Sequence, residues 1–292
     1  MEFLDLPIEL IERILIICDP IDVSEVAQTC RFLHSLICAS ADSVLWRELY
    51  LMQELDDPRD CVGQDGKQRL QIDWRKELQC IIRARTVLEH PSTMRPQELG
   101  RILETLIMLV YFIKPCTSPD AWFPGLSKNL EWVSNGLRRG LLDRIQDSEE
   151  FHSSHQIAAR LHTYYGLTKN DAARSRLAES RAFVYLLRNY SPETEYGPFM
   201  PDGSVNWIHL CAIRHVVSSH LMDIDEDTRE EIEYGSFPIS LAFTQICLPQ
   251  DDVDLDWERD WAGLTGTWIV AFCFCDHREL LREWIRQLLF IN

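Results

Sequence analysis

The stretch MEFLDLPIELIERILIICDP, from Met1 to Pro20, decides how the N-terminal part of this chain folds. Its apolar residues recur three and four positions apart, the spacing that places side chains on one face of an α-helix. They form a stripe of Leu6, Leu10, Ile11, Ile14 and Leu15. Pro7 suits the first turn, where its missing N–H is not needed, and Pro20 closes the segment. We therefore expect a helix from about Leu6 to Cys18.

So short a helix leaves its apolar stripe in need of cover. Burial of one Leu or Ile side chain contributes about 1.5–3 kcal/mol, so the five residues represent roughly 10 kcal/mol if all are covered. Either the rest of this chain packs over the stripe as ordinary core, or another protein binds it. We expect that so small a unit does not cover the whole stripe by itself.

Further short helices are expected before residue 53. Asp22 and Glu25 have the spacing of a capping box and indicate that a second helix starts there. Helical periodicity continues through Leu33 and Ile37, breaks near residues 40–43 and resumes in VLWRELYLM, from Val44 to Met52. Three or four short helices therefore fit within about 50 residues.

One combination of residues runs through these helices in register. It reads LP-x-E-L-x-x-x-I-L, then D-P-x-D, then C-R, then L-W-R, and consists of Leu6, Pro7, Glu9, Leu10, Ile14, Leu15, Asp19, Pro20, Asp22, Cys30, Arg31, Leu45, Trp46 and Arg47. This combination resembles the F-box, over roughly residues 3–50. In that family a compact trio of helices packs its exposed apolar surface on the Skp adaptor, which a cullin scaffold holds in turn.

The resemblance implies that the stripe is a partner surface. The residues implied to contact the adaptor are Leu6, Pro7, Leu10, Ile14 and Leu15, with Cys30, Leu33 and Trp46 closing the same surface or its supporting core. Cys18 and Val23 stand where the family often has a larger apolar residue. These two departures bear on how tightly the adaptor is held more than on whether it binds.

Composition and charge exclude several other classes of protein. With 292 residues, 46% of them hydrophobic, the chain is long enough to bury a sizeable core. Its formal charge of −17 opposes binding to nucleic acids and anionic membranes. Residues 201–292 carry 17 acidic and 6 basic residues, so this third is either a solvated acidic surface or a docking surface for a basic partner.

The cysteines and the N-terminus indicate a reducing compartment. Ten cysteines are scattered without a CxxC pair, and acidic Glu2, Asp5 and Glu9 occupy the region where a secretory signal has a basic start. The longest apolar run, Leu106 to Ile113, falls far short of the roughly 20 residues that cross a bilayer. We expect a soluble protein of the cytoplasm, the nucleus or both.

The rest of the chain reads as mainly α. After a polar, turn-rich linker or exposed loop at 54–68, helices are expected, some of them partial, at Leu70–Glu89, Gln97–Ile113, Leu126–Arg144, His155–Tyr165, Lys169–Tyr190 and Val205–Met222. The helix at 97–113 should be buried core because it is strongly apolar. We therefore predict an F-box module at 1–53, the linker, a helical domain at 69–235 and a small α+β part at 236–292.

The predicted α+β part rests on two alternating segments, Phe237–Leu248 and Gly266–Cys275, which have the period of strands and can pair as a short two-stranded element. Gly-Thr-Trp at the start of the second resembles the start of lipocalin-like barrels. A closed barrel needs about eight strands, and the residues that follow are too few. One hypothesis is that the chain stops where relatives continue; a longer reading frame in the transcript would support it, and a mature protein ending at Asn292 would contradict it.

The remaining motifs do not indicate a catalytic or metal site. Cys273, Cys275 and His277 lack a second ligand pair for zinc, and the acidic runs 223–227 and 252–256 lack the glycine of a calcium loop. Phosphate-binding, dinucleotide-binding and nucleophile-elbow motifs are absent from the sequence. His152, His155 and His162 have no apparent carboxylate or cysteine partner, so we expect them at the surface. We expect no metal, no cofactor and no catalysis by this chain.

The F-box resemblance implies a non-enzymatic substrate-recognition adaptor of an SCF-type ubiquitin ligase, which binds the Skp adaptor and an unknown target protein. Residues 181–210 and 260–280 are also similar to segments of fungal F-box proteins. Two alternatives stay open. One is a Skp-bound scaffold without a ligase role. The other is a protein that binds a small apolar ligand, suggested by Trp257, Trp261 and Trp268, although ordinary packing also accounts for these tryptophans.

Overall fold

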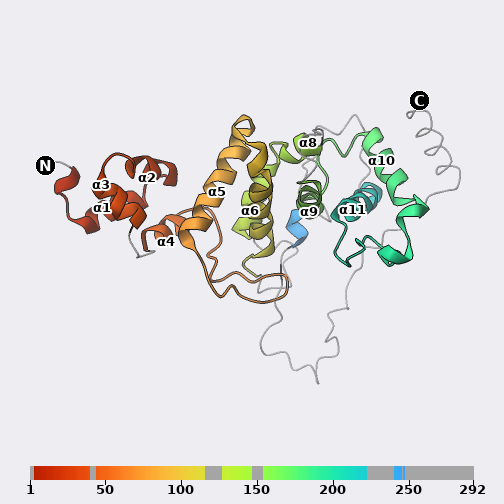
Figure 1. The fold of residues 1–292 in the computed structure, drawn as a ribbon, viewed down its shortest axis with the longest axis horizontal. Helices are drawn as coiled ribbons and strands as arrows, with labels where there is room; N and C mark the ends of the chain where they lie inside the picture. The colour runs from red at the N-terminus through yellow and green to blue at the C-terminus, as the bar shows by residue number, and fades with distance from the viewer. Residues whose placement is uncertain are drawn as a thin grey trace, which may run out of the picture. The chain divides into compact units, whose positions relative to one another are not determined.

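The computed structural model describes residues 3–39, 44–115, 127–146, 154–221, 240–244 and 246. These residues form helices joined by turns and by longer loops (Figure 1), and the extended pairings among them are three isolated bridges. The chain divides into two compact units. Unit 1 comprises residues 1–115 and 125–136, and unit 2 comprises 116–124 and 137–292. The mainly α fold predicted from the sequence is confirmed, whereas the predicted boundaries near 53, 68 and 235 stay predictions.

Unit 1 begins with a set of short helices and continues into two longer ones. Its elements are η1 (Phe3–Asp5), α1 (Ile8–Ile16), α2 (Pro20–Val26), α3 (Arg31–His34), a π-helical turn η2 (Ser35–Ala39), α4 (Val44–Leu51), α5 (Trp74–Glu89), η3 (Pro91–Thr93), η4 (Pro96–Glu98), α6 (Leu99–Tyr111) and α7 (Lys128–Leu137), whose last residue falls in unit 2. Contacts run from α1 to α4, from α4 to α5 and from α5 to α6. The small N-terminal helices are therefore continuous with a larger helical core.

The second helix starts earlier than the capping-box spacing predicts. Asp19 is the N-cap residue of α2, and its side chain accepts a 2.9 Å hydrogen bond from the backbone N–H of Ile21. Pro20 occupies the first turn instead of closing the preceding helix. The prediction at Asp22 was wrong because a proline at the first helical position, preceded by an aspartate cap, is the stronger start signal.

The core of unit 1 lies between α5 and α6. The side chains of Leu78 and Ile81 on α5 and of Leu103 and Leu106 on α6 are almost fully buried. The apolar helix predicted at 97–113 is thus buried as expected, with α6 as its regular part. At the other end of α5, the ring of Trp74 meets Tyr50 of α4 edge-on, with 5.5 Å between centroids.

Part of the segment predicted as a linker or exposed loop, 54–68, is buried in unit 1. Asp56 is 5% exposed, and its carboxylate accepts hydrogen bonds from the Ser127 hydroxyl, from the backbone N–H of Lys128 at 3.1 Å and from that of Lys114 at 3.3 Å. Val62 forms a bridge with Ile113, two residues after the end of α6. Polar, turn-rich composition did not reveal this burial, because the partners of Asp56 lie about 60 to 70 residues away in the sequence.

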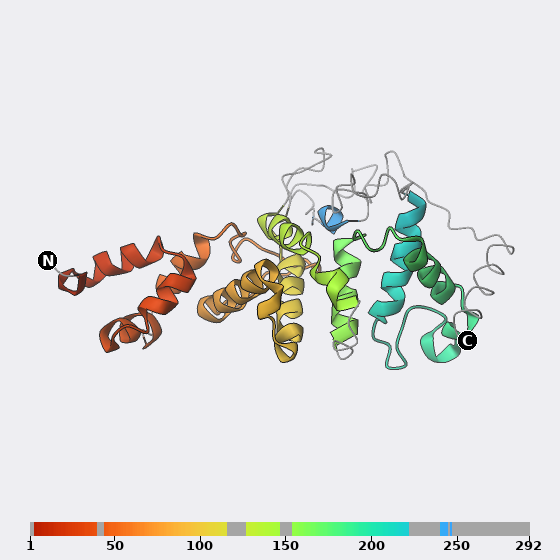
Figure 2. The same ribbon diagram turned by 90° about the horizontal axis from the view of Figure 1, so that it is seen from above.

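Unit 2 contains α8 (Leu141–Gln146), α9 (His155–Tyr165), α10 (Arg174–Val184), η6 (Leu187–Asn189), η7 (Pro192–Thr194), α11 (Trp207–Leu221) and η8 (Leu241–Thr244). Helix α11 packs against both α9 and α10 (Figure 2). Arg160 of α9 lies 5.2 Å from the ring centroid of Trp207, and Gln156 accepts a 2.8 Å hydrogen bond from the Trp207 backbone N–H. These contacts fix the start of α11 against α9.

The described residues of the predicted strand Phe237–Leu248 do not form a strand. Leu241–Thr244 is a 3₁₀ turn in which the Thr244 hydroxyl donates a 2.7 Å hydrogen bond to the Leu241 carbonyl. A local side-chain bond of this kind competes with strand pairing, and alternation over a few residues is a weak signal. The second predicted strand, 266–275, lies outside the described residues, as do the tryptophans at 257, 261 and 268.

Candidate functional site

Helix α1 carries two apolar faces with opposite surroundings. Ile11 is 0% exposed and Leu15 is 2% exposed, so these side chains, four residues apart, face the interior of unit 1. Leu10, Ile14 and Ile17 recur at i, i+4 and i+7 and are 46%, 38% and 74% exposed. The broad stripe read from the sequence is therefore split: one half is covered by this chain and the other half is not.

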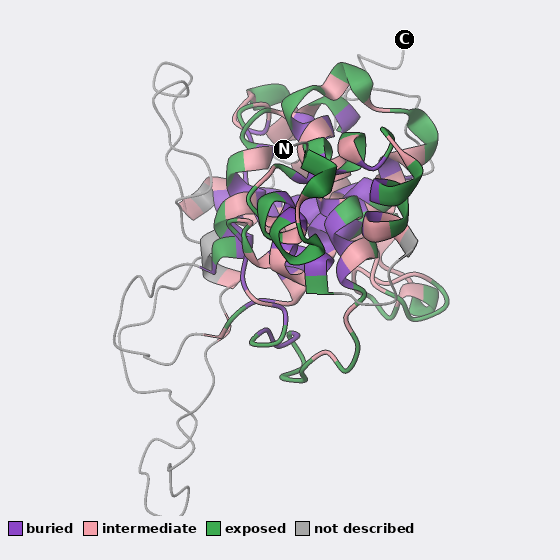
Figure 3. Cartoon of the chain, turned by 90° about the vertical axis from the view of Figure 1, so that its left-hand side faces the viewer, coloured by how far each residue is buried: buried purple, intermediate pink, exposed green. Residues whose placement is uncertain are grey.

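The uncovered half of α1 belongs to a concentration of exposed apolar side chains. Of the fourteen exposed large hydrophobic residues in the described part of the chain, nine lie between residues 3 and 44. They are Phe3, Leu4, Ile8, Leu10, Ile14, Ile17, Ile21, Phe32 and Val44. Figure 3 views the chain from this side and colours the exposed positions green. Exposed apolar side chains concentrated in one short stretch of a folded domain favour a protein-binding surface.

The predicted adaptor-binding residues fall into three groups by burial. Pro7, Leu10 and Ile14 are exposed; Leu6 and Cys30 are half-buried; Leu15, Leu33 and Trp46 are buried. The buried group lies beneath the surface as its supporting core. Ile8 and Ile17, which the sequence reading did not select as contact residues, are exposed in the same region.

The turn after α3 is held by side chains from later in the sequence. The indole N–H of Trp46 donates a 3.0 Å hydrogen bond to the carbonyl of Ile37, and Arg75 of α5 donates a 2.7 Å hydrogen bond to the carbonyl of Cys38. The same guanidinium lies 5.4 Å from the centroid of the Trp46 ring. Carbonyl groups at helix ends lack partners within the helix, so these bonds satisfy them and fix the turn.

Unit 2 contains a buried polar centre that the sequence reading missed. His162 Nε2 lies 2.7 Å from the carboxylate of Asp171, and both residues are almost fully buried. Burial opposes the charged ring, but the charge of Asp171 outweighs it and raises the pKa of His162 well above its usual value. Burial likewise opposes the carboxylate, and the charge of His162 lowers the pKa of Asp171. The two groups form a buried ion pair.

The prediction that His162 lies at the surface was therefore wrong. Its partner, Asp171, follows nine residues later in the chain. Between them, at the end of α9, Gly166 has a φ of 107° and reverses the direction of the chain. The left-handed region favours glycine, and this turn brings Asp171 to His162. His152 and the Cys273, Cys275 and His277 group lie outside the described residues.

A second histidine completes this polar centre. His215 of α11 is buried, its Nε2 lies 2.9 Å from the backbone carbonyl of Asp171, and its Nδ1 lies 2.8 Å from the Ser180 hydroxyl. Burial lowers the pKa of His215. The ring is therefore neutral at pH 7, with Nε2 donating to the carbonyl and Nδ1 accepting from the hydroxyl. The three residues join α9, α11 and the turn before α10.

The comparisons with known proteins bear on the N-terminal surface. None of the helices in the described ranges is long and apolar enough to cross a membrane. Neither the curated proteins nor the solved structures yielded a match to the chain. Residues 3–41, which include α1 to α3 and the exposed apolar surface, match the model of the F-box domain, so this chain carries an F-box domain at its N-terminus.

Proposed function

We propose that this chain is a non-catalytic substrate-recognition subunit of an SCF-type ubiquitin ligase. The observation that carries the proposal is the uncovered stripe of Leu10 and Ile14 on α1 and Ile17 at its C-cap, within the segment that matches the F-box domain. An F-box domain implies binding to the Skp adaptor, and an exposed apolar helix face is the chemistry that such a contact requires. Through the adaptor, the chain would join a cullin scaffold.

The exposed stripe would supply the binding energy of the adaptor contact. Full burial of a Leu or Ile contributes about 1.5–3 kcal/mol, and these side chains are about half exposed, so each has about 1 kcal/mol left to gain from a partner. Leu6, Pro7 and Cys30 would extend the contact at its edge. Leu15, Leu33 and Trp46 would act indirectly by keeping α1 in place.

The rest of the chain would hold a target protein. A receptor bound to the ligase keeps target lysines at a high effective concentration near a charged ubiquitin-conjugating enzyme, and no catalytic group is needed on the receptor. This role requires a firm joint between the F-box and the following helices. The contacts of Arg75 and Arg85 on α5 with the F-box segment support such a joint.

This proposal does not name the target protein or the segment of the target that the chain would recognise. We further propose that the chain acts in the cytoplasm or nucleus, where SCF ligases operate and their targets are degraded. Its kinship to fungal F-box proteins and the role of its acidic C-terminal third stay predictions.

A reconstituted ligase tests the proposal. The full chain, the Skp adaptor, a cullin with its RING subunit and the ubiquitin enzymes are combined with candidate targets captured by the full chain. The proposal expects ubiquitin transfer to a captured target that stops when Leu10→Asp replaces the wild type. Assembly with the cullin but no transfer to any captured target would instead identify a Skp-bound scaffold.

A further inference from the structure

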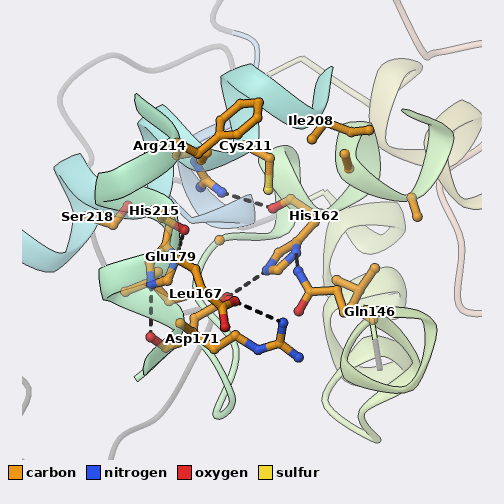
Figure 4. Close-up of a pocket in the computed structure, with 18 of the residues that line it drawn as sticks. Gln146, His162, Leu167, Asp171, Glu179, Ile208, Cys211, Arg214, His215 and Ser218 are labelled. Atoms are coloured by element: carbon orange, nitrogen blue, oxygen red, sulfur yellow. Dashed lines mark hydrogen bonds and ion pairs between the residues drawn. The ribbon is translucent and has the colours of Figure 1, made fainter. Parts of the chain in front are cut away.

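Unit 2 contains a cavity of about 360 Å³ beside the buried polar centre (Figure 4). Part of its wall is apolar and is made by Leu142 and Ile145 of α8, Phe183 of α10 and Ile208 of α11. This volume lies within the range of small-molecule sites, which are mostly apolar with a few polar groups that orient the ligand. The cavity is thus large enough and suitably lined for an organic ligand.

Helix α11 supplies a run of polar groups to the cavity. Cys211, Arg214 and Ser218 follow Ile208 at spacings of three or four residues and line the cavity together. Residues at these spacings share one face of a helix. A helix that packs between two others ordinarily turns an apolar face inward, so polar residues on this face of α11 need a reason other than packing.

Arg214 is a half-buried cation with few partners. Its guanidinium donates one hydrogen bond, of 3.1 Å, to the backbone carbonyl of His162. Among the described residues no carboxylate lies within ion-pair distance of it. Burial lowers the pKa of Arg214 to about 10, so the group is still charged at pH 7. A guanidinium has five N–H donors, and most of those on Arg214 are left for water or a ligand.

The charge of Arg214 is not balanced by the polar centre next to it. The carboxylate of Asp171 is already paired with the cationic ring of His162, and His215 is neutral. The three groups together therefore carry no net charge. A half-buried cation without a counterion is costly, and an anion that enters the cavity relieves that cost.

Ser218 gives a second, independent sign that the cavity receives a ligand. It is 3% exposed, lines the cavity, and its hydroxyl has no hydrogen-bond partner. Buried hydroxyl groups are nearly always hydrogen-bonded, so an unpartnered one in a cavity wall is a place for a polar atom from outside the chain.

We propose that this cavity binds an apolar organic acid, whose carboxylate pairs with Arg214, whose body lies against Ile145, Phe183 and Ile208, and which offers a hydrogen-bonding atom to Ser218. A guanidinium binds a carboxylate through two parallel N–H bonds, which suits Arg214 better than a neutral ligand does. A free acid and the C-terminal residue of a polypeptide present the same chemistry. This inference does not depend on the function of the F-box.

The test uses methyl NMR of the full chain labelled at isoleucine. The probes are a set of apolar monocarboxylic acids, each with its neutral carboxamide, and short peptides that end in leucine with a free or an amidated C-terminus. We expect acids to shift the methyl signals of Ile145 and Ile208 and to leave Ile81 of unit 1 unchanged. Each matched carboxamide should need at least tenfold more ligand, because it lacks the charge.

Two variants and a control connect the binding to the site. Arg214→Met should remove the preference for acids over carboxamides, Ser218→Ala should weaken binding several-fold, and Arg188→Met, at an exposed position of η6, should change nothing. If Arg214→Met does not fold, the proposal is tested by two other results: the difference in affinity of the wild type for acids and carboxamides, and the loss of binding in Ser218→Ala. Binding of free acids alone, or of C-terminal peptides alone, supports the site. Either result also identifies whether the ligand is a free acid or the C-terminus of a polypeptide. Equal shifts by acids and carboxamides, or none by any probe, would overturn it.

Discussion

The carboxylate of Asp19 accepts two hydrogen bonds of 2.8 Å from Nη2 of Arg85, although 66 residues separate the two in the chain. Asp19 is also the N-cap of α2, so one side chain starts an F-box helix and joins it to α5. Partial burial of Asp19 works in the opposite direction, but the bond from Arg85 lowers the pKa of its carboxyl. The F-box is thereby tied to the body of unit 1.

The Asp19–Arg85 contact should be worth little to stability by itself. Asp19 is exposed, and exposed ion pairs contribute about 0.2–1 kcal/mol. We expect a double-mutant cycle of Asp19→Asn and Arg85→Met, measured by urea unfolding, to give a coupling energy in that range. This coupling energy should fall as salt is added. A coupling that does not change with salt would show that the pair acts through buried packing instead.

Leu15 and Leu10 should respond differently to the same truncation. Leu15→Ala removes a buried side chain, so the free energy of unfolding should fall by about 2–5 kcal/mol. Leu10→Ala removes an exposed one and should change it by less than about 0.5 kcal/mol. Denaturant unfolding followed by circular dichroism measures both. Equal losses would mean that this chain covers both halves of the stripe.

Asp56 should be the most sensitive position in the segment 54–68. Asp56→Ala removes a buried acceptor of three hydrogen bonds, from the Ser127 hydroxyl and from the backbone N–H groups of Lys114 and Lys128, which should cost about 2–4 kcal/mol. Asp65→Ala, in the same segment but exposed, should leave stability nearly unchanged. Thermal unfolding of the two variants beside the wild type makes the comparison. Similar melting temperatures for both would contradict the role assigned to Asp56.

The His162–Asp171 pair should make stability depend on pH. The pKa of His162 is raised on folding, so its contribution is complete below about pH 6.5 and declines as the pH rises towards the folded value. The pKa of Asp171 is lowered, so its contribution is present above about pH 3.9 and is lost as the pH falls towards the folded value. The pair should therefore stabilise unit 2 most between these limits.

The pH dependence is measured as the difference in unfolding free energy between the wild type and the double variant His162→Gln/Asp171→Asn. The difference should be largest near pH 5 to 6 and should shrink on both sides. Arg188→Met, which touches neither group, serves as the control and should follow the wild type at each pH. A difference that stays constant across the range would show that the pair is not ionised in the folded chain.

Periodicity predicted the helices well, because an amphipathic helix repeats its pattern locally. The helix expected at His155–Tyr165 coincides with α9, and the helix expected at Val205–Met222 is close to α11. Periodicity did not reveal which half of the α1 stripe is covered, since Leu10 and Leu15 fit the same pattern and differ only in tertiary packing, to which the contact of α1 with α4 contributes.

The polar groups of unit 2 could not be predicted for a different reason. His162 and Asp171 meet only because the chain turns at Gly166, and a spacing of nine residues matches no helical or strand period. One signal was present: Arg214, His215 and Ser218 lie close together on one side of the helix expected at 205–222. In the structure this helix, α11, packs on two others, so polar residues clustered on one side of it indicate a buried site.

The central claim is that the exposed stripe of α1 binds the Skp adaptor, and co-purification by size exclusion tests it most directly. The wild type, Leu10→Asp and the control Leu187→Asp, at a position that is 83% exposed in unit 2, are each mixed with the adaptor. Circular dichroism checks that each variant stays folded.

We expect the wild type and Leu187→Asp to co-elute with the adaptor. Leu10→Asp should lose about 2–4 kcal/mol of binding energy, roughly 30- to 1,000-fold in affinity, because its carboxylate would be buried without a partner. A folded wild type that elutes alone, or a folded Leu10→Asp that still binds as tightly as the wild type, would contradict the account.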